Sequence, residues 1–505
     1  MVKKFLLVSL IGLSVLSCGD DFDDKPVVPP VNKEPVNEDP KSDSEDVNLH
    51  VKDFIWQGLN SYYLWQGDVK DLADKRFGDS IPDLKNAEYK KFLEGYDNPK
   101  TLFYNLLNDY GHIDRFSYIT DDYTVLEEAF KGISLSSGMD YQLMAYDNNG
   151  VVAVVRYVLP NSGAEAAGIK RGDAFTKVDG ELLNTSNYRS LLLSGKTQLT
   201  LEMAKIEVRE NNRYKVINTG KAVTLTQTKL TENPILISKV IEKSGHKIGY
   251  LMYNSFVADF DLKLNEVFAK FKAEGVTDLV LDLRYNGGGR VSSAIYLSSM
   301  ITGQFNKQLF SKEQWNSKLQ PIREKIGGVE NFFVDKIYNN TGTTSLANIN
   351  SLGLTRLYVL TTGRTASASE LVINGLRAYI EVTQIGGTTV GKNQASVTVY
   401  DYIGTGRSRV KNPSHKWAMQ PLVLKMANAK GFSDYTSGLA PTIELKEDLS
   451  NMGVLGEESE PFLAKAIERI TGQTSRAYTR KTVAPSLEVI DDSKSGIFGY
   501  NEMYK

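Results

Sequence analysis

Residues 278–300 read DLVLDLRYNGGGRVSSAIYLSSM, which places a short apolar run, a glycine loop and a longer apolar run in direct succession. The first run is typical of a buried strand and the second of a helix. A strand at 248–252 and a helix at 262–274 are predicted before this segment, and a strand at 357–361 and a helix at about 367–379 after it. Because strands that alternate with helices form mainly parallel sheets covered by helices, an α/β layered core is predicted here.

Ser367 lies where the predicted strand at 357–361 gives way to a helix, within the run TASASE at 365–370. A helix N-terminus offers unpaired amides and a positive dipole to an oxyanion, so Ser367 is a candidate nucleophile. The same residues allow a structural alternative. In a Ser-x-x-Glu capping box, Ser367 and Glu370 would only satisfy the first turn of the helix.

Lys392 ends a glycine-rich run, GGTTVGK at 386–392. Lysine is protonated at neutral pH, so it can accept the proton of a serine only if burial lowers its pKa by several units. The sequence therefore predicts a dry pocket around Lys392, to which Ile385 and Val390 would contribute.

Together these motifs resemble the carboxyl-terminal processing peptidases, or tail-specific proteases, whose Ser-Ala-Ser-Ala-Ser-Glu motif is followed by a Gly-Lys pair at this distance. Thr365 replaces the first serine of the motif. The resemblance implies a ClpP/crotonase-like core, Ser367 as nucleophile, Lys392 as general base and no cofactor. Many members carry a glutamine four residues past the lysine. This chain has Ser396 there and Gln394 two residues past, which leaves the third catalytic residue open.

The glycine loop LRYNGGG at 283–289 resembles the Asp-Leu-Arg-x-Asn-x-Gly-Gly motif of the same peptidases. It lacks the residue order of a phosphate-binding or dinucleotide-binding loop. The resemblance implies an oxyanion hole in which the backbone amide of Gly288 acts with that of Ala368. The structural alternative is a tight Asn-Gly turn without a catalytic role.

Residues 126–205 are rich in short strands and glycine turns, and the run PNSGAEAAGIKRGD at 160–173 resembles the central signature of a PDZ domain. A PDZ domain binds an extended peptide at an exposed sheet edge and captures its terminal carboxylate with backbone amides. The carboxylate-binding loop is matched by four residues, Gly132, Ile133, Ser134 and Leu135, with Ser134 in place of the usual second glycine. The resemblance implies protein or peptide partners with free C-termini, and Ile133 and Leu135 beside the loop predict a preference for apolar ends.

The first eighteen residues have the pattern of an export signal, with Lys3 and Lys4 followed by an apolar run at 5–16. The run VLSC at 15–18 resembles a bacterial lipobox, in which the cysteine is lipidated. Cys18 is the only cysteine of the chain, and the alternative is a plain signal peptide. The acidic run behind it resembles surface-export signals of Bacteroidetes lipoproteins, and the alternative is a solvated part of the tether. We therefore expect a lipid-anchored protein of the cell envelope, at the outer membrane or cell surface.

Composition and patterning divide the rest of the chain. A formal net charge of −2 predicts no general attraction to nucleic acid, and the four histidines and one cysteine have no metal-ligand spacing. The predicted segments are a signal peptide at 1–18, a disordered tether at 19–46, a helical domain at 47–125, the PDZ domain at 126–205, the peptidase domain at 206–475 and a C-terminal tail at 476–505. A charged hairpin is expected near 206–221, and the tail after 476 matches no known pattern.

These features predict a serine-type endopeptidase that cleaves proteins near their C-terminal tails with a Ser/Lys dyad. One alternative is a catalytically silent, PDZ-containing binding lipoprotein, and another is a crotonase-type acyl-CoA enzyme. An exported, membrane-tethered location disfavours the acyl-CoA enzyme. The sequence leaves the oligomeric state open.

Overall fold

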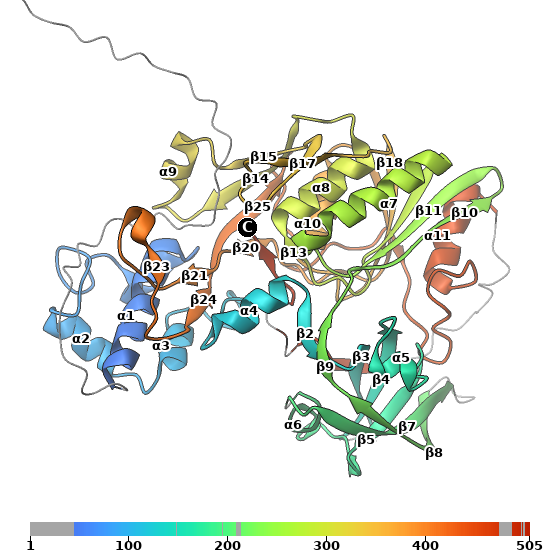
Figure 1. Cartoon of the computed structure of the whole chain (residues 1–505), viewed down its shortest axis with the longest axis horizontal. Coiled ribbons are helices and arrows are strands. Elements are labelled where there is room, and N and C mark those ends of the chain that lie inside the picture. The colour runs from blue at the N-terminus through green and yellow to red at the C-terminus, as the bar shows by residue number, and fades with distance from the viewer. Residues whose placement is uncertain are drawn as a thin grey trace, which may run out of the picture.

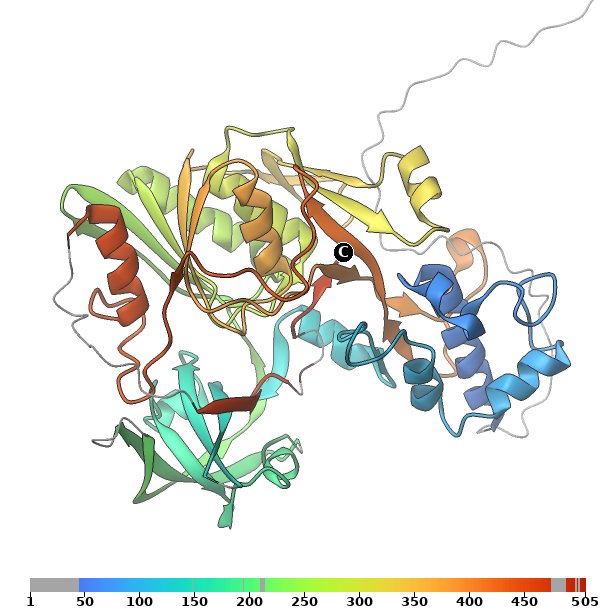
Figure 2. The same ribbon diagram turned by 180° about the vertical axis from the view of Figure 1, so that it is seen from behind.

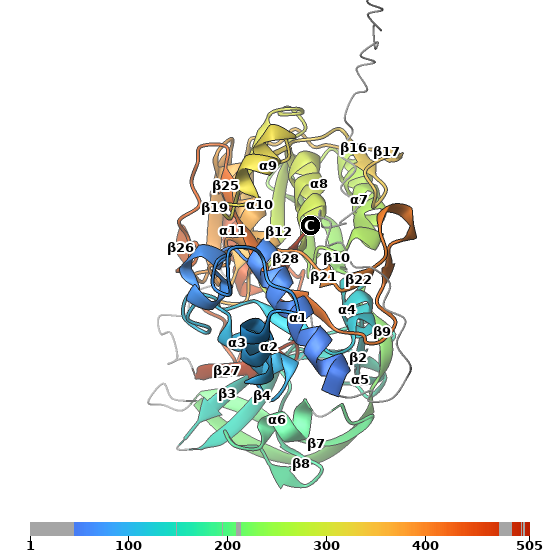
Figure 3. The same cartoon turned by 90° about the vertical axis from the view of Figure 1, so that its left-hand side faces the viewer.

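The computed structural model describes residues 45–147, 149–193, 195–208, 214–473, 487–495, 497 and 500–505. The predicted signal peptide, Cys18 and nearly all of the predicted tether lie outside these residues. The described chain forms an N-terminal helical domain, a second domain built on one sheet, and a large α/β core (Figure 1). Seen from the side, the N-terminal helices lie in front, with the core above and the second domain below (Figure 3). None of the described helices is long and apolar enough to cross a membrane.

The N-terminal domain packs three helices, α1 (Glu45–Tyr62), α2 (Ala87–Glu94) and α3 (Pro99–Asn105). Val51, Ile55 and Leu59, which recur at helical spacing, are fully buried on one face of α1. A short strand, β1 (Tyr118–Thr120), then pairs with β24 (Ala418–Gln420) of the core. The domain is thus attached to the core by backbone hydrogen bonds. Helix α4 (Tyr123–Phe130) crosses the boundary that we expected at 125/126.

The second domain is a sheet in the order β27-β3-β4-β5-β7-β8, with β6 paired to β5. Its elements are β3 (Met139–Tyr146), β4 (Gly150–Val158), α5 (Gly163–Ala166), β5 (Ala174–Val178), β6 (Glu181–Leu182), α6 (Tyr188–Leu192), β7 (Gln198–Val208), β8 (Tyr214–Thr226) and β27 (Glu488–Asp492). The boundary expected at 205/206 is wrong, because it cuts β7, which pairs with β8 along most of its length. The predicted charged hairpin is therefore part of this sheet.

A narrow two-stranded connection joins the second domain to the core. Strand β2 (Ile133–Ser136) runs antiparallel to β9 (Thr228–Thr231), so the chain enters and leaves the domain side by side. Figure 1 shows this pair between the two bodies. The second domain is thus joined to the core by this neck and also packs against it, since Val152 and Ile206 share a hydrophobic cluster with Met452 of the core.

The α/β core is built on a six-stranded sheet in the order β10-β11-β12-β18-β19-β26. These strands are β10 (Ile235–Lys243), β11 (His246–Tyr253), β12 (Asp278–Asp282), β18 (Arg356–Thr361), β19 (Glu381–Gly386) and β26 (Ile443–Glu444). All pairings except β10 with β11 are parallel, which confirms the predicted mainly parallel sheet.

Helices cover both faces of this sheet because successive strand residues point to opposite sides. Leu251, Leu281 and Val359 pack on one side with α7 (Asp261–Glu274), α8 (Val291–Thr302) and α10 (Ala368–Arg377). Their neighbours Tyr250 and Leu360 pack on the other side with α11 (Pro461–Thr471). Figure 2 shows α11 set apart from the other three helices.

A second sheet of the core, in the order β13-β28-β20-β25-β14-β15, contains the C-terminus. Its strands are β13 (Gly289–Arg290), β28 (Met503–Tyr504), β20 (Gln394–Ser396), β25 (Leu422–Asn428), β14 (Leu309–Trp315) and β15 (Glu330–Phe332). The segment expected as a separate tail after 476 thus adds β27 to the second domain and β28 to the core. The C-terminus lies near the middle of the molecule (Figures 1 and 2).

A buried ionic cluster ties the glycine loop to these elements. Arg284 is fully buried and donates to the carboxylates of Asp282 and Glu460, each at 2.7 Å. Arg171 of the second domain donates to the hydroxyl of Tyr285 at 2.7 Å. Removing one partner of a buried ion pair destabilises the fold, because the other charge is left unpaired. The cluster therefore holds the base of the loop in one position.

Candidate active site

Ser367 lies directly before α10, at the end of the loop that follows β18. Its backbone has φ 65° and ψ −118°, a region that non-glycine residues rarely occupy. The side chain is fully buried, and its hydroxyl has no hydrogen-bond partner in the part of the chain that the structure describes. A strained turn thus presents an unpaired hydroxyl at the positive end of a helix.

Ser367 and Glu370 have the arrangement of a capping box, as the structural alternative predicts. The amide of Ser367 donates to Oε2 of Glu370 at 2.7 Å, and the Ser367 side chain faces the amide of Glu370 without a hydrogen bond of ordinary geometry. The capping box is therefore present, and it does not tie up the hydroxyl of Ser367.

Glu370 connects the loop of Ser367 to the loop of Lys392. Its buried carboxylate accepts from the amides of Ser367 at 2.7 Å, Gly391 at 2.7 Å and Lys392 at 2.9 Å, and from the hydroxyl of Thr389. Burial raises the pKa of Glu370, and the hydrogen bonds oppose that shift. One side chain therefore sets the relative position of the two predicted catalytic residues.

Lys392 is fully buried, as its predicted role requires. Burial lowers the pKa of this lysine, and the neighbouring carboxylate of Glu502 opposes part of the shift. The ring of Phe116, from the N-terminal domain, lies 4.9 Å from Nζ, and Arg115 donates to the carbonyl of Gly391 at 2.9 Å. The pocket is thus closed partly by a domain in which the sequence showed no catalytic feature.

The Nζ of Lys392 does not reach the hydroxyl of Ser367 in this structure. It donates to the carbonyl of Asn501 at 2.9 Å and forms an ion pair with Oε1 of Glu502 at 3.0 Å. Both partners belong to the C-terminal segment that was expected to be a tail. The two residues of the predicted dyad are therefore both buried at one site but form no hydrogen bond with each other.

The glycine loop passes close to Ser367. Gly288 has φ 114°, and a Cβ at this position would lie 2.6 Å from Cβ of Ser367 and 2.4 Å from the carbonyl oxygen of Glu502. The same point lies 3.0 Å from the amide nitrogen of Ala368. Only glycine allows this approach, so the loop and the helix N-terminus line one small space.

The amides of the loop are used differently from the expectation. The amide of Gly288 donates to Oδ1 of Asn286 at 2.8 Å, because the Asn286 side chain folds back over its own loop. The amide of Gly289 instead donates to the carbonyl of Glu502 at 2.6 Å. A role for Gly288 in an oxyanion hole would require its hydrogen bond to Asn286 to be exchanged, whereas Gly289 already binds a peptide carbonyl.

Neither candidate for the third residue forms a hydrogen bond with Nζ of Lys392. The hydroxyl of Ser396 donates to Oε2 of Glu502 at 2.6 Å and accepts from the side-chain amide of Gln420 at 3.0 Å. Among the described residues, Oε1 of Gln394 has no hydrogen-bond partner. The third residue remains a prediction.

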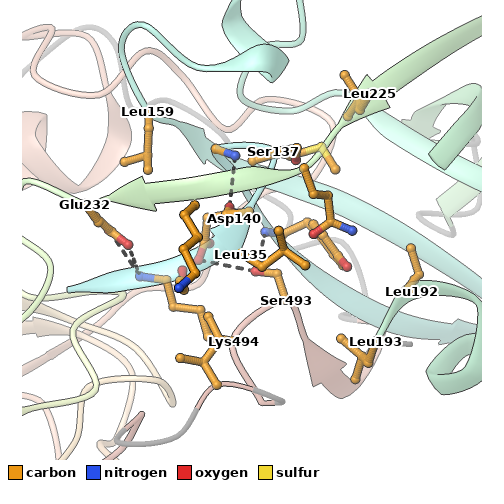
Figure 4. A pocket seen from close by; sticks show the side chains of 18 of the residues that line it. Leu135, Ser137, Asp140, Leu159, Leu192, Leu193, Leu225, Glu232, Ser493 and Lys494 are labelled. Atoms are coloured by element: carbon orange, nitrogen blue, oxygen red, sulfur yellow. Dashed lines mark hydrogen bonds and ion pairs between the residues drawn. The ribbon is translucent and has the colours of Figure 1, made fainter. Parts of the chain in front are cut away.

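The predicted peptide-binding residues border a cavity of about 420 Å³ in the second domain (Figure 4). Ile133, Ser134 and Leu135 line it, together with the leucines at the end of α6, whereas Gly132 does not. Ile133, Ser134 and Leu135 belong to β2, which pairs with β9 up to Ser136. The turn at 136–138 then leads to the start of β3. Ser493 and Lys494 of the C-terminal segment lie at the mouth of the cavity (Figure 4).

Three contributors to the site were not identified as such from the sequence. Glu370 was visible as a capping residue, but its contact with Lys392 depends on tertiary structure. Phe116 and Glu502 carry no motif, since each reaches the site from a distant part of the chain.

Two family models match this chain. Residues 247–425 match Peptidase family S41, and residues 50–118 match the Peptidase S41 N-terminal domain. These ranges contain both predicted catalytic residues and the segment with Arg115 and Phe116.

Individual relatives agree with these matches. The chain is 25% identical over 290 residues to a carboxyl-terminal-processing protease of Picosynechococcus and 23% identical over 347 residues to the carboxy-terminal processing protease CtpA of Bacillus subtilis. The alignments cover 55% and 66% of this chain, and 61% and 65% of the relatives' lengths. A candidate S41 protease of Bacteroides fragilis has a similar structure, with a TM-score of 0.61 and 25% identity over 84% of this chain and 98% of that one.

The close approach at Gly288 predicts a severe effect of Gly288→Ala. The added methyl group would collide with Ser367 and with the Glu502 carbonyl, so we expect a loss of about 2 to 4 kcal/mol in the free energy of unfolding. Gly245→Ala is the matched control, since Gly245 also has positive φ, at 80°, but a Cβ there meets no atom within 4 Å. The control should lose only about 1 kcal/mol. Equal losses in chemical denaturation of the two variants would contradict the steric argument.

Proposed function

We propose that this chain, whose N-terminal domain and α/β core match models of the S41 peptidases, is a serine-type endopeptidase with a Ser367/Lys392 dyad. The observation that carries the proposal is the Glu370 carboxylate, which accepts hydrogen bonds from the amides of both residues. A purely structural serine and lysine would not require a strained serine backbone and a buried, desolvated lysine at one site.

In the proposed reaction, the hydroxyl of Ser367 attacks a peptide carbonyl while Nζ of Lys392 takes its proton. The same proton then passes to the leaving amine, and water releases the acyl group from Ser367. The amide of Ala368, at the positive end of α10, and an amide of the glycine loop would stabilise the oxyanion. Gly289 is the candidate for this second donor, because its amide already donates to the backbone carbonyl of Glu502.

We further propose that the second domain acts as a PDZ domain that receives the C-terminal tail of the substrate. Its cavity lies at the start of β3, between the turn after β2 and the end of α6. The lining includes Leu192, Leu193 and Leu225 (Figure 4), which favours an apolar terminal side chain. Cleavage near the C-terminus would follow from holding the tail in this lobe beside the core.

The dyad is tested by Lys392→Arg, which keeps the positive charge but cannot act as a base. We expect turnover of an unstructured peptide to fall by about a thousandfold or more. For the wild type, kcat/KM should rise with pH as Lys392 loses its proton, and the midpoint should lie below the ordinary range of lysine because burial lowers this pKa.

A fluorophosphonate probe provides the control for this experiment. The wild type should be labelled and Ser367→Ala should not, since the probe reacts only with an activated serine. Near-wild-type turnover by Lys392→Arg would refute Lys392 as the general base. A wild type that stays unlabelled even in the presence of a substrate peptide would favour the catalytically silent binding protein.

The proposed PDZ role predicts that a peptide with a free, apolar C-terminus binds more tightly than the same peptide with an amidated end. Charged groups contribute strong hydrogen bonds, so we expect amidation to weaken binding by about tenfold or more. Titration of Ser367→Ala with the two peptides measures this difference without cleavage. Equal affinities for the two peptides would show that the domain does not bind the terminal carboxylate.

We also propose that Cys18 carries a lipid anchor and that the protein resides in the cell envelope, at the outer membrane or cell surface. The support is the lipobox-like run at 15–18 and the proline-containing, acidic segment behind it. Cys18→Ala should release the protein from membranes in fractionation. The anchor would be refuted if this variant still incorporated labelled fatty acid and sedimented with membranes.

A further inference from the structure

The C-terminal segment, residues 487–495, 497 and 500–505, occupies both of the sites just proposed. Strand β27 lies on the second domain and β28 lies in the core, next to Ser367 and Lys392. Figure 2 shows β27 at the edge of the second domain and the C-terminus close to the core. No feature of the sequence after residue 476 indicated either contact.

In the second domain the segment binds as an added strand. Strand β27 runs antiparallel to β3, with Glu488 opposite Ala145 and Asp492 opposite Gln142. Beyond the strand, the amide of Ser493 donates to the carbonyl of Tyr141 at 3.0 Å. This is the geometry by which sheet edges bind extended peptides.

Side chains of β27 add acidic contacts to this pairing. Asp491 accepts from the hydroxyl of Tyr188 at 3.0 Å and pairs with Arg189, both on α6. Asp492 is fully buried and lies 3.1 Å from the guanidinium of Arg364, three residues before Ser367. The edge of β3 therefore suits an extended acidic peptide, and its occupant touches the loop of the nucleophile.

After Ser493 the segment turns away from β3, toward the core. The cavity of about 420 Å³ lies at this turn, lined by Ser493 and Lys494. Strand β27 ends at Asp492, before the cavity, and a peptide that continued along β3 would enter it. The groove is thus occupied along β3, and its end is left open.

In the core the segment crosses the catalytic site as a peptide would. Strand β28 pairs in parallel with β13 and adjoins β20, and the carbonyl of Glu502 accepts from the amide of Gly289 at 2.6 Å. The Glu502 side chain accepts a hydrogen bond from Ser396 at 2.6 Å and lies 3.0 Å from Nζ of Lys392. Tyr504 stacks on Phe130 with ring centroids 4.1 Å apart.

The Glu502 contact opposes the chemistry proposed for Lys392. A carboxylate 3.0 Å from Nζ favours the ammonium form, which has no lone pair to accept the proton of Ser367. The carbonyl of Asn501 takes a second Nζ hydrogen at 2.9 Å. The segment therefore blocks the site and favours the form of Lys392 that cannot act as a base, and the hydroxyl of Ser367 remains unpaired.

We propose that this C-terminal segment is an intramolecular peptide ligand of both the β3 edge and the catalytic site, and that it holds the chain in an inactive form until another peptide displaces it. This inference rests on the proposed function. The competing ligand is an extended peptide with acidic side chains facing α6 and a free C-terminus that reaches the cavity. It would replace β27, withdraw Asp492 from Arg364 and release Glu502 from Lys392.

Two full-length variants test the inference from its two ends. Glu502→Gln removes the charge beside Lys392, and Asp491→Asn weakens the strand on β3. We expect both to accelerate fluorophosphonate labelling of Ser367, Glu502→Gln by about tenfold or more, because each raises the fraction of molecules with an open site. Glu488→Gln is the matched control, since Glu488 lies on the same segment but is exposed, and its labelling rate should equal that of the wild type.

Hydrogen exchange gives a readout that does not require activity. In the wild type the amides of β27 and of residues 501–504 should be protected, and Glu502→Gln should shorten the protection of 501–504. Equal labelling rates for wild type and Glu502→Gln, or unprotected 488–492 and 501–504 in the wild type, would overturn the inference. If the wild type and every variant stay unlabelled, the proposed function fails, and exchange alone decides whether the segment is bound.

Discussion

The arrangement of the candidate site depends on one buried carboxylate. Glu370 lies on the first turn of α10 and accepts from the amides of Ser367, Gly391 and Lys392. A carboxylate with four donors in a dry interior is costly to move, because each lost hydrogen bond would leave a buried polar group unsatisfied. Two loops that follow different parallel strands are thereby held together, and the strained backbone of Ser367 is maintained by the same contact.

The surrounding domains act on this site through a few long-range contacts. Arg115 and Phe116 close the lysine pocket from the N-terminal domain, and Arg171 of the second domain reaches Tyr285 in the glycine loop. The second domain also meets the core at the β2–β9 neck and where Val152 and Ile206 pack with Met452. The segment bound at β3 contacts the core directly as well, through Asp492 and Arg364.

Much of the fold followed from local patterns. The alternation of apolar strands and helices predicted the mainly parallel sheet, and the observed β12, α7 and α8 lie within a few residues of their expected ranges. Domain limits were less accurate, because β7 continues through the expected boundary at 205/206. The hairpin of β7 and β8 is rich in charged residues, so its sequence does not resemble that of a strand in a domain sheet.

The sequence by itself determined the strand–helix order of the core and singled out Ser367, Lys392 and the glycine loop, because these properties depend on neighbours along the chain. Only the tertiary structure decided what surrounds them. Glu370 as the link between the loops, Phe116 over Lys392 and Glu502 beside it are contacts between distant segments, and no local pattern encodes such pairs. The C-terminal segment carries no motif, and its place on two sheets arises because exposed strand edges accept any extended chain that fits their hydrogen bonds and charges.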